Sequence, residues 1–208
     1  PEIEPERIEV CPNSVELATN LPMVDKVTIR NKFGIPANSV VFIYGGNLGK
    51  PQGLDFLLRI LDSNRDKKDR YFLVVGSGTE YGKILQWFNE NKPENAQLLQ
   101  ALPKQDYDEL VQSCDVGLIF LYPRFTIPNY PSRLLSYLEY KMPVLLATDL
   151  NTDIGEIAEQ NGYGLWCENG DLGKFNLLLN GLASDPVLRN EMGEKGYKFL
   201  QENYTVEK

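Results

Sequence analysis

Residues 39–61 read SVVFIYGGNLGKPQGLDFLLRIL, and this stretch decides the fold. It opens with a continuous apolar run, Ser39–Tyr44, which is typical of a strand buried on both faces, as in a parallel sheet. A glycine-rich turn follows, and leucines then recur at the spacing of one helix face: Leu54, Leu57, Leu58 and Leu61. The stretch therefore predicts one βα unit.

The same alternation continues along the chain. Further strong apolar runs are Tyr71–Val75, Val116–Leu121 and Val144–Ala147, and weaker ones are Ile8–Cys11, Ala96–Leu99 and Gly164–Cys167. Between these runs, Tyr107, Leu110, Val111 and Cys114 recur at the spacing of one helix face. After them, we predict a helix from Pro186 to about Asn203, capped by Asp185, with Leu188, Met192 and Phe199 on one face. We predict a single α/β domain over residues 1–208, with a Rossmann-like doubly wound parallel sheet and helices on both faces.

Composition narrows the chemistry. The chain has 208 residues, of which 42% are hydrophobic, and a net charge of −8 (21 basic minus 29 acidic), which disfavours nucleic acid as a partner. It has no histidine, which excludes Ser-His and Cys-His triads and His-ligated metal sites within this chain. Cys11, Cys114 and Cys167 lie far apart without a CxxC pair, so we expect reduced core residues.

Ligands of doubly wound sheets bind beyond the carboxyl ends of the strands, so the loops after the apolar runs are the candidate site. The first, Gly45–Gly53, is similar to a Walker phosphate loop, but its spacing is too short and Pro51 stands where magnesium needs a hydroxyl. Glycines with inward-pointing amides and the charge of Lys50 still suit a diphosphate. A plain βα turn with an exposed lysine is the alternative.

The second loop starts Gly76-Ser77-Gly78, after a strand. It misses the GxGxxG fingerprint because position 81 is Tyr, so a dinucleotide site is only weakly indicated. A tight turn with Thr79 as a helix cap is the alternative.

The third loop, residues 122–132, is long and holds three prolines and three aromatic residues. Such loops in compact domains are usually functional. Ser132 then begins a helix with Arg133 in its first turn, where a cation opposes the helix dipole. An anion at this helix end would offset the mismatch and accept bidentate hydrogen bonds from Arg133. A solvated arginine is the alternative.

Taken in order, these loops resemble the C-terminal, nucleotide-sugar-binding domain of two-domain GT-B glycosyltransferases, in the large retaining (family 4-like) group that builds bacterial polysaccharides. The resemblance covers nearly the whole chain and rests on five loose motifs in register. They are Val10–Glu16 against IPNGVD, Gly46–Gly53 against GRL…KG, Val74–Gly78 against IVGDG, Leu110–Leu118 against YAAADV, and Lys141–Val144 against GKPVVA.

The sequence departs from this family at charged positions. Asn47 stands where the family usually has Arg, and the usual Lys falls on Gln52, so Lys50 would act from a shifted position. The family's paired glutamates fall near Pro128 and Ser136, neither of which is acidic. The stretch PSRLLSYL, residues 131–138, instead resembles a subgroup that includes N-acetylfucosamine transferases.

The resemblance implies a glycosyltransferase that binds a nucleotide diphosphate sugar, with UDP as the expected nucleotide. The expected diphosphate clamp is Gly46, Asn47, Lys50, Ser132 and Arg133, and the expected contacts to ribose, base or sugar are Ser77, Gly78, Leu102, Tyr130, Ser136 and Glu139. Cations would stabilise the charge that develops on the leaving group. The one Asp-x-Asp triplet, Asp106-Tyr107-Asp108, falls on a predicted helix, and we expect neither a metal nor another cofactor. No catalytic residue can be named.

The resemblance also implies the partners. The acceptor would be a polysaccharide or a lipid-linked sugar, as in capsule or O-antigen assembly, bound to an N-terminal domain that we expect to be missing. The isolated chain would then bind donor weakly and transfer nothing. We expect a cytoplasmic protein, with peripheral contact to the inner membrane at full length. Three alternatives remain open: a sugar-nucleotide epimerase-like domain, an NAD(P)-type dinucleotide-binding module built on Gly76–Gly78, and a pure interaction domain.

Overall fold

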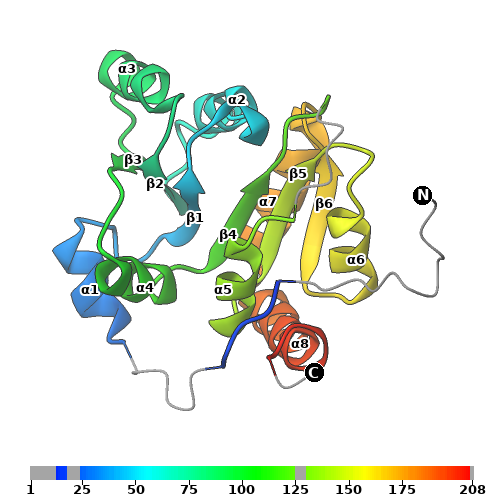
Figure 1. Ribbon diagram of the computed structural model, residues 1–208. Coiled ribbons are helices and arrows are strands. Elements are labelled where there is room, and N and C mark those ends of the chain that lie inside the picture. The colour runs from blue at the N-terminus through cyan, green and yellow to red at the C-terminus, as the bar shows by residue number, and fades with distance from the viewer. Residues whose placement is uncertain (1–12, 18–23, 125–129, 207–208) are drawn as a thin grey trace.

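The computed structural model describes residues 13–17, 24–124 and 130–206. Six parallel strands form one sheet in the order β3-β2-β1-β4-β5-β6 (Figure 1). They are β1 Val40–Asn47, β2 Arg70–Ser77, β3 Ala96–Leu99, β4 Val116–Phe120, β5 Val144–Thr148 and β6 Gly164–Glu168. Chain order reverses between β1 and β4, which is the position where doubly wound folds bind ligands.

Helices cover both faces of this sheet, as the sequence predicts. They are α1 Lys26–Lys32, the short 3₁₀ helix η2 Lys50–Gln52, α2 Asp55–Ser63, α3 Tyr81–Asn91, α4 Lys104–Gln112, α5 Arg133–Glu139, α6 Ile154–Gln160, α7 Leu172–Ser184 and α8 Pro186–Asn203. The core is divided between the two faces: α4, α5 and α6 contribute to one cluster, and α2, α3 and α7 to the other. Side chains alternate between the clusters along each strand, so Ile43 enters the first and Tyr44 the second.

The predicted strands within the described residues are all present, and Ile8–Cys11 lies outside them. Asp185 caps α8 as predicted, because its carboxylate accepts the Leu188 N–H at 2.8 Å. The alternative for the second loop, with Thr79 as a helix cap, is wrong in its cap: Glu80 is the N-cap of α3, and it makes no side-chain cap bond. Cys114 and Cys167 are buried and free, as expected, and Cys11 lies outside the described residues.

One buried ion pair explains the Cys-Asp-Val motif before β4. The carboxylate of Asp115 accepts the Val41 N–H at 2.8 Å and a hydrogen bond from Arg30 Nη2 at 2.7 Å. Arg30 also donates to the Ser113 carbonyl through Nε and Nη2, at 2.9 and 2.8 Å. Asp115 thus ties α1 and β1 to the start of β4, so this part of the family resemblance reflects folding.

A search of the described residues found no helix long and apolar enough to cross a membrane.

Candidate functional site

A cleft of about 670 Å³ lies at the carboxyl ends of the central strands. It is built by the ends of β1 and β2, the segment after β3, α4 and the start of α5. Its lining is Gly45, Gly46, Asn47, Val75, Gly76, Ser77, Ala101, Leu102, Tyr107, Ser132, Arg133 and Ser136. The cleft therefore occupies the position at which doubly wound sheets bind their ligands.

The glycine-rich segment after Tyr44 is not the loop that the sequence predicts. Residues 45–47 continue β1, with Gly46 beside Gly76 of β2 and Asn47 beside Ser77. A side chain at residue 76 would collide with the Gly46 carbonyl, and Gly46 itself has φ +122°. These glycines let two strands approach closely at the rim of the cleft.

The sequence predicts that the amides of this segment point inward to bind phosphate, and two of them do not. The Gly45 N–H donates to the Tyr137 hydroxyl at 3.2 Å, and the Leu48 N–H donates to the Ser77 carbonyl at 2.8 Å. Both amides are used by the fold, because β1 runs on beside β2 and α5 packs behind it. The lining of the cleft also includes one charged side chain.

That side chain is Arg133, at the first position of α5. Its Nη2 donates one long hydrogen bond, 3.4 Å, to Oε1 of Gln52, and its Nη1 is buried without a hydrogen-bond partner. No ion pair of Arg133 occurs within the described ranges. Because a buried N–H donor without a partner is costly, its presence at a cleft indicates a site for an anion.

Three tyrosines surround this guanidinium without neutralising it. The Arg133 Cζ lies 4.5 Å from the centre of the Tyr44 ring, and Tyr107 and Tyr137 lie close enough to affect its electrostatics. Burial raises the pKa of all three phenols, although the positive charge of Arg133 opposes the shift. The phenols therefore stay protonated, and the cleft keeps a full positive charge.

The tyrosines also shape the end of β1. The Tyr107 hydroxyl fills the space that a side chain on Gly45 would need, and the Tyr137 hydroxyl bridges the Gly45 N–H to the Ile43 carbonyl. The floor of the cleft is thus made by α4 and α5 packing against a strand that lacks a side chain at that point.

The structure brings together most of the predicted site residues and leaves four outside. Those that line the cleft are Gly46, Asn47, Ser77, Leu102, Ser132, Arg133 and Ser136. Lys50 is exposed and borders a separate cavity of about 470 Å³ with Tyr122, Glu80 and Lys83. Gly78 packs behind the rim, against the Leu48 carbonyl, and Glu139 does not line the cleft.

Tyr130 points elsewhere. Its hydroxyl accepts a 2.8 Å hydrogen bond from Tyr204, beyond the end of α8, and the two rings lie 5.9 Å apart. The Val15 N–H donates to the Tyr204 carbonyl at 2.8 Å, so Tyr130 belongs to a contact between the described N-terminal segment and the C-terminal end. Pro128, the other position compared with the family's glutamates, lies outside the described residues.

Sequence reasoning missed Gln52, Tyr44 and Tyr107. Gln52 is buried beside Arg133, and its signal was its place at the family's usual lysine. Tyr44 and Tyr107 fall on regular strand and helix patterns, which predict core positions and nothing more. Their role depends on α4, β1 and α5 meeting, which no local pattern shows.

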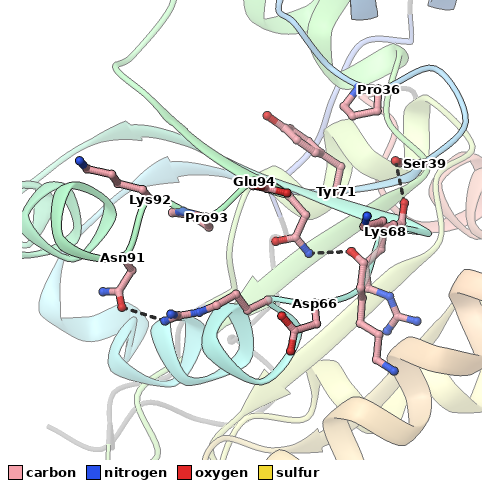
Figure 2. A pocket seen from close by; sticks show the side chains of 13 residues that line it. Pro36, Ser39, Asp66, Lys68, Tyr71, Asn91, Lys92, Pro93 and Glu94 are labelled. Carbon is pink, nitrogen blue, oxygen red and sulfur yellow. Dashed lines mark hydrogen bonds between the residues drawn. The ribbon is translucent and has the colours of Figure 1, made fainter.

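A second cavity, also about 670 Å³, lies at the amino ends of β1 and β2. Five of its lining residues are basic, but Lys68 and Lys92 stand at opposite sides of it (Figure 2). Its buried guanidinium, Arg70, is saturated by Asn64, Asn180 and Asp69 at 3.1, 2.7 and 2.8 Å. This cavity therefore has positive side chains without a converging, unsatisfied donor.

Comparison with known proteins identifies the family to which this chain belongs. The sequence matches the family described as "Glycosyl transferases group 1" over residues 25–199. The chain belongs to this family. Over 159 residues it is 25% identical to the putative colanic acid biosynthesis glycosyl transferase WcaI of Escherichia coli, covering 74% of this chain and 38% of WcaI. The chain spans 38–53% of the length of the curated relatives that it matches.

Solved structures support the GT-B assignment of this group 1 glycosyltransferase domain. Anabaena HepE in complex with UDP and glucose superposes with a TM-score of 0.72 at 17% identity, over 88% of this chain and 48% of HepE. The C-terminal domain of a group 1 glycosyl transferase, LpcC from Francisella tularensis, gives a TM-score of 0.66 at 16% identity, over 92% and 96% of the two chains. At these identities the likeness establishes the fold.

Within the described residues, no group of three or more Cys, Asp or Glu side chains is arranged to hold a metal ion. Among the residues that line the cleft, Arg133 carries the charge that a bound anion would meet.

Proposed function

We propose that this chain is the C-terminal, donor-binding domain of a glycosyltransferase, and that its cleft binds the diphosphate of a UDP-sugar on Arg133. The observation that carries the proposal is the partly buried guanidinium of Arg133, whose buried Nη1 has no hydrogen-bond partner, at the point where strand order reverses. A guanidinium presents parallel N–H donors that match phosphate oxygens, so a diphosphate would satisfy Nη1 and balance the charge.

The rest of the lining suits the other parts of such a donor. Leu102 offers an apolar surface at one side of the cleft, while Ser136, Ser132 and Ser77 offer hydroxyls. We assign the nucleobase to the segment around Leu102 and the ribose to Ser136, which stands at the family's second glutamate. The UDP complex of HepE supports the choice of nucleotide.

The chemistry that this half supplies is electrostatic. As the bond between sugar and diphosphate breaks, negative charge grows on the leaving group, and a fixed cation in a partly buried site lowers the energy of that state. We propose that Arg133 has this role without a metal ion. The residue that acts on the acceptor would lie on an N-terminal domain, so we expect donor binding without transfer by the chain alone.

The likeness to WcaI, named for colanic acid biosynthesis, supports a polysaccharide or lipid-linked sugar as acceptor. We place the protein in the cytoplasm, where sugar nucleotides are made, with peripheral membrane contact at full length. The N-acetylfucosamine-like subgroup is part of this proposal, and its support is the PSRLLSYL stretch.

Calorimetric titration of the isolated chain with UDP tests the proposal. We expect saturable binding, and we expect Arg133→Met to weaken it by about 100-fold, because a charge-assisted bidentate contact is lost. Lys50→Met is the matched control: it also removes one positive charge at this end of the sheet, but outside the cleft, and should change the affinity by less than about threefold.

Parallel titrations with NADH and GDP sharpen the result. Binding of NADH but not UDP would overturn the proposal in favour of a dinucleotide module. Binding of GDP in preference to UDP would keep the diphosphate site and correct the base. No response to any nucleotide would favour an interaction domain.

A further inference from the structure

Tyr44 connects the two walls of the cleft. It lies on β1 with a fully buried side chain, and its hydroxyl donates a 2.7 Å hydrogen bond to the Asn47 carbonyl. That bond spans Gly45 and Gly46, the two residues at which the strand lacks side chains. The hydroxyl therefore fixes the backbone at the strand-side wall of the cleft.

The ring of the same residue supports the opposite wall. The Arg133 guanidinium lies over its face, with Cζ 4.5 Å from the ring centre. The ring is itself held in the core, with its centre 5.7 Å from that of Phe120, which packs on Phe175 in turn. An arginine over an aromatic face is attracted to the ring's negative quadrupole, and more strongly when both are shielded from water.

An aromatic partner leaves the charge of Arg133 unbalanced, whereas a carboxylate partner would neutralise it. Arg30 and Arg70 are held by Asp115 and Asp69, so their charges are balanced within the protein. Tyr44 holds Arg133 without adding a negative charge, since burial keeps the pKa of its phenol raised. The guanidinium is thus placed and also left free to balance a ligand.

We propose that Tyr44 is the positioning residue of the donor cleft: its ring orients Arg133 toward the diphosphate, and its hydroxyl sets the distance of the β1 rim. This inference rests on the proposed function. It assigns Tyr44 no contact with the ligand, since Tyr44 is absent from the lining of the cleft.

Two substitutions separate the roles of the Tyr44 ring and the Tyr44 hydroxyl. The measured quantity is the UDP affinity of each isolated variant chain. Tyr44→Phe keeps the ring and removes one hydrogen bond, and should weaken binding about fivefold. Tyr44→Leu also removes the aromatic face, and should weaken binding about 30-fold. Tyr71→Phe is the matched control, because it removes a largely buried phenol on the neighbouring strand, at the other cavity, and should leave UDP affinity unchanged.

A double-mutant cycle measures the coupling between Tyr44 and Arg133 in UDP binding, which a merely structural role of Tyr44 would not produce. If the Tyr44 ring acts through Arg133, Tyr44→Leu should weaken binding about 30-fold in the wild-type chain and only about fivefold in the Arg133→Met chain, because the loss of the hydroxyl's hydrogen bond to β1 remains in both. Equal losses in both backgrounds would overturn the inference and leave the proposed function intact. Absence of UDP binding by the wild-type chain would overturn the proposed function itself, and the inference with it. Thermal melting identifies any variant that fails to fold, and Tyr44→Met, which also removes the aromatic ring, then replaces Tyr44→Leu in the same cycle.

Discussion

The two ends of β1 and β2 each open into a cavity of about 670 Å³, and each cavity has an arginine, buried at the amino ends and partly buried at the carboxyl ends. At the amino ends, Arg70 donates hydrogen bonds to Asn64, Asn180 and Asp69. At the carboxyl ends, Arg133 has one long bond to Gln52 and a donor with no partner. The amino-end cavity has more cations, yet its buried cation is satisfied.

The difference shows that the number of positive residues does not identify an anion site in this protein. Lys67, Lys68 and Lys92 are exposed, and water already solvates their charges. Arg133 has lost most of its water and received no carboxylate in return, so a ligand has more to gain there. One partly buried guanidinium with an unsatisfied donor is therefore a better anion site than five basic residues that are exposed or paired.

The largest effect that would test this comparison is expected at Arg70. Arg70→Met leaves buried Asn64 without one of its partners and removes a bond to Asp69, which should lower the free energy of unfolding by about 3 kcal/mol. UDP affinity of the folded variant should not change. Urea denaturation and calorimetry measure the two quantities, and a loss of UDP affinity with little loss of stability would reverse the roles assigned to the two arginines.

A second effect concerns the phenols behind the carboxyl-end cleft. Burial holds the pKa of Tyr137 well above its usual range, so at high pH the unfolded chain releases a proton that the folded chain keeps. This contribution to stability is complete below about pH 10 and is lost as the pH rises further. Between pH 9 and 11, wild type should lose about 1.4 kcal/mol more stability than Tyr137→Phe. Parallel urea midpoints for the two proteins over that range would contradict the burial of this phenol.

A third test is the stability of Arg133→Met. Replacing an uncompensated buried charge by an apolar side chain of similar length should leave the free energy of unfolding within about 1 kcal/mol of wild type, or raise it. Urea denaturation without nucleotide measures this. A loss as large as that expected for Arg70→Met would mean that Arg133 holds the fold together and is not reserved for a ligand.

The smallest effect is expected at Lys68. Lys68→Met removes an exposed cation from the amino-end cavity and should change the stability by less than about 0.5 kcal/mol. UDP affinity should stay the same at low and at moderate salt. If calorimetry showed a clear loss of affinity, long-range attraction by the amino-end lysines would have to be added to the account of the cleft.

The fold could be predicted well because its signals are local. Runs such as Ser39–Tyr44 and Val144–Ala147 are short, apolar and rich in residues that favour strands, and the helices between them have clear periodicity. The error at Gly45–Asn47 has a physical cause. A pair of glycines in a sequence predicts a turn, but here Gly45 and Gly46 allow β1 to continue beside β2 where side chains would collide.

The site could be predicted only in part. Arg133 stood out because a cation opposes the dipole at the start of a helix, and that local conflict pointed to a ligand. Lys50 is predicted from its charge and as a shifted substitute for the family's usual lysine, and the structure places it at another cavity. Tyr44 belongs to an apolar strand pattern and Gln52 to a turn. The importance of both depends on their contact with Arg133, which is distant in the sequence.

The contact between Gly45 and Tyr107 bears on how this domain can diverge. The Tyr107 hydroxyl occupies the volume that a methyl group at residue 45 would need, so the two positions share one fixed space. A change at either one alone leaves a clash or a gap beneath the cleft. Descendants of this sequence should therefore substitute residues 45 and 107 together, although 62 positions separate them along the chain.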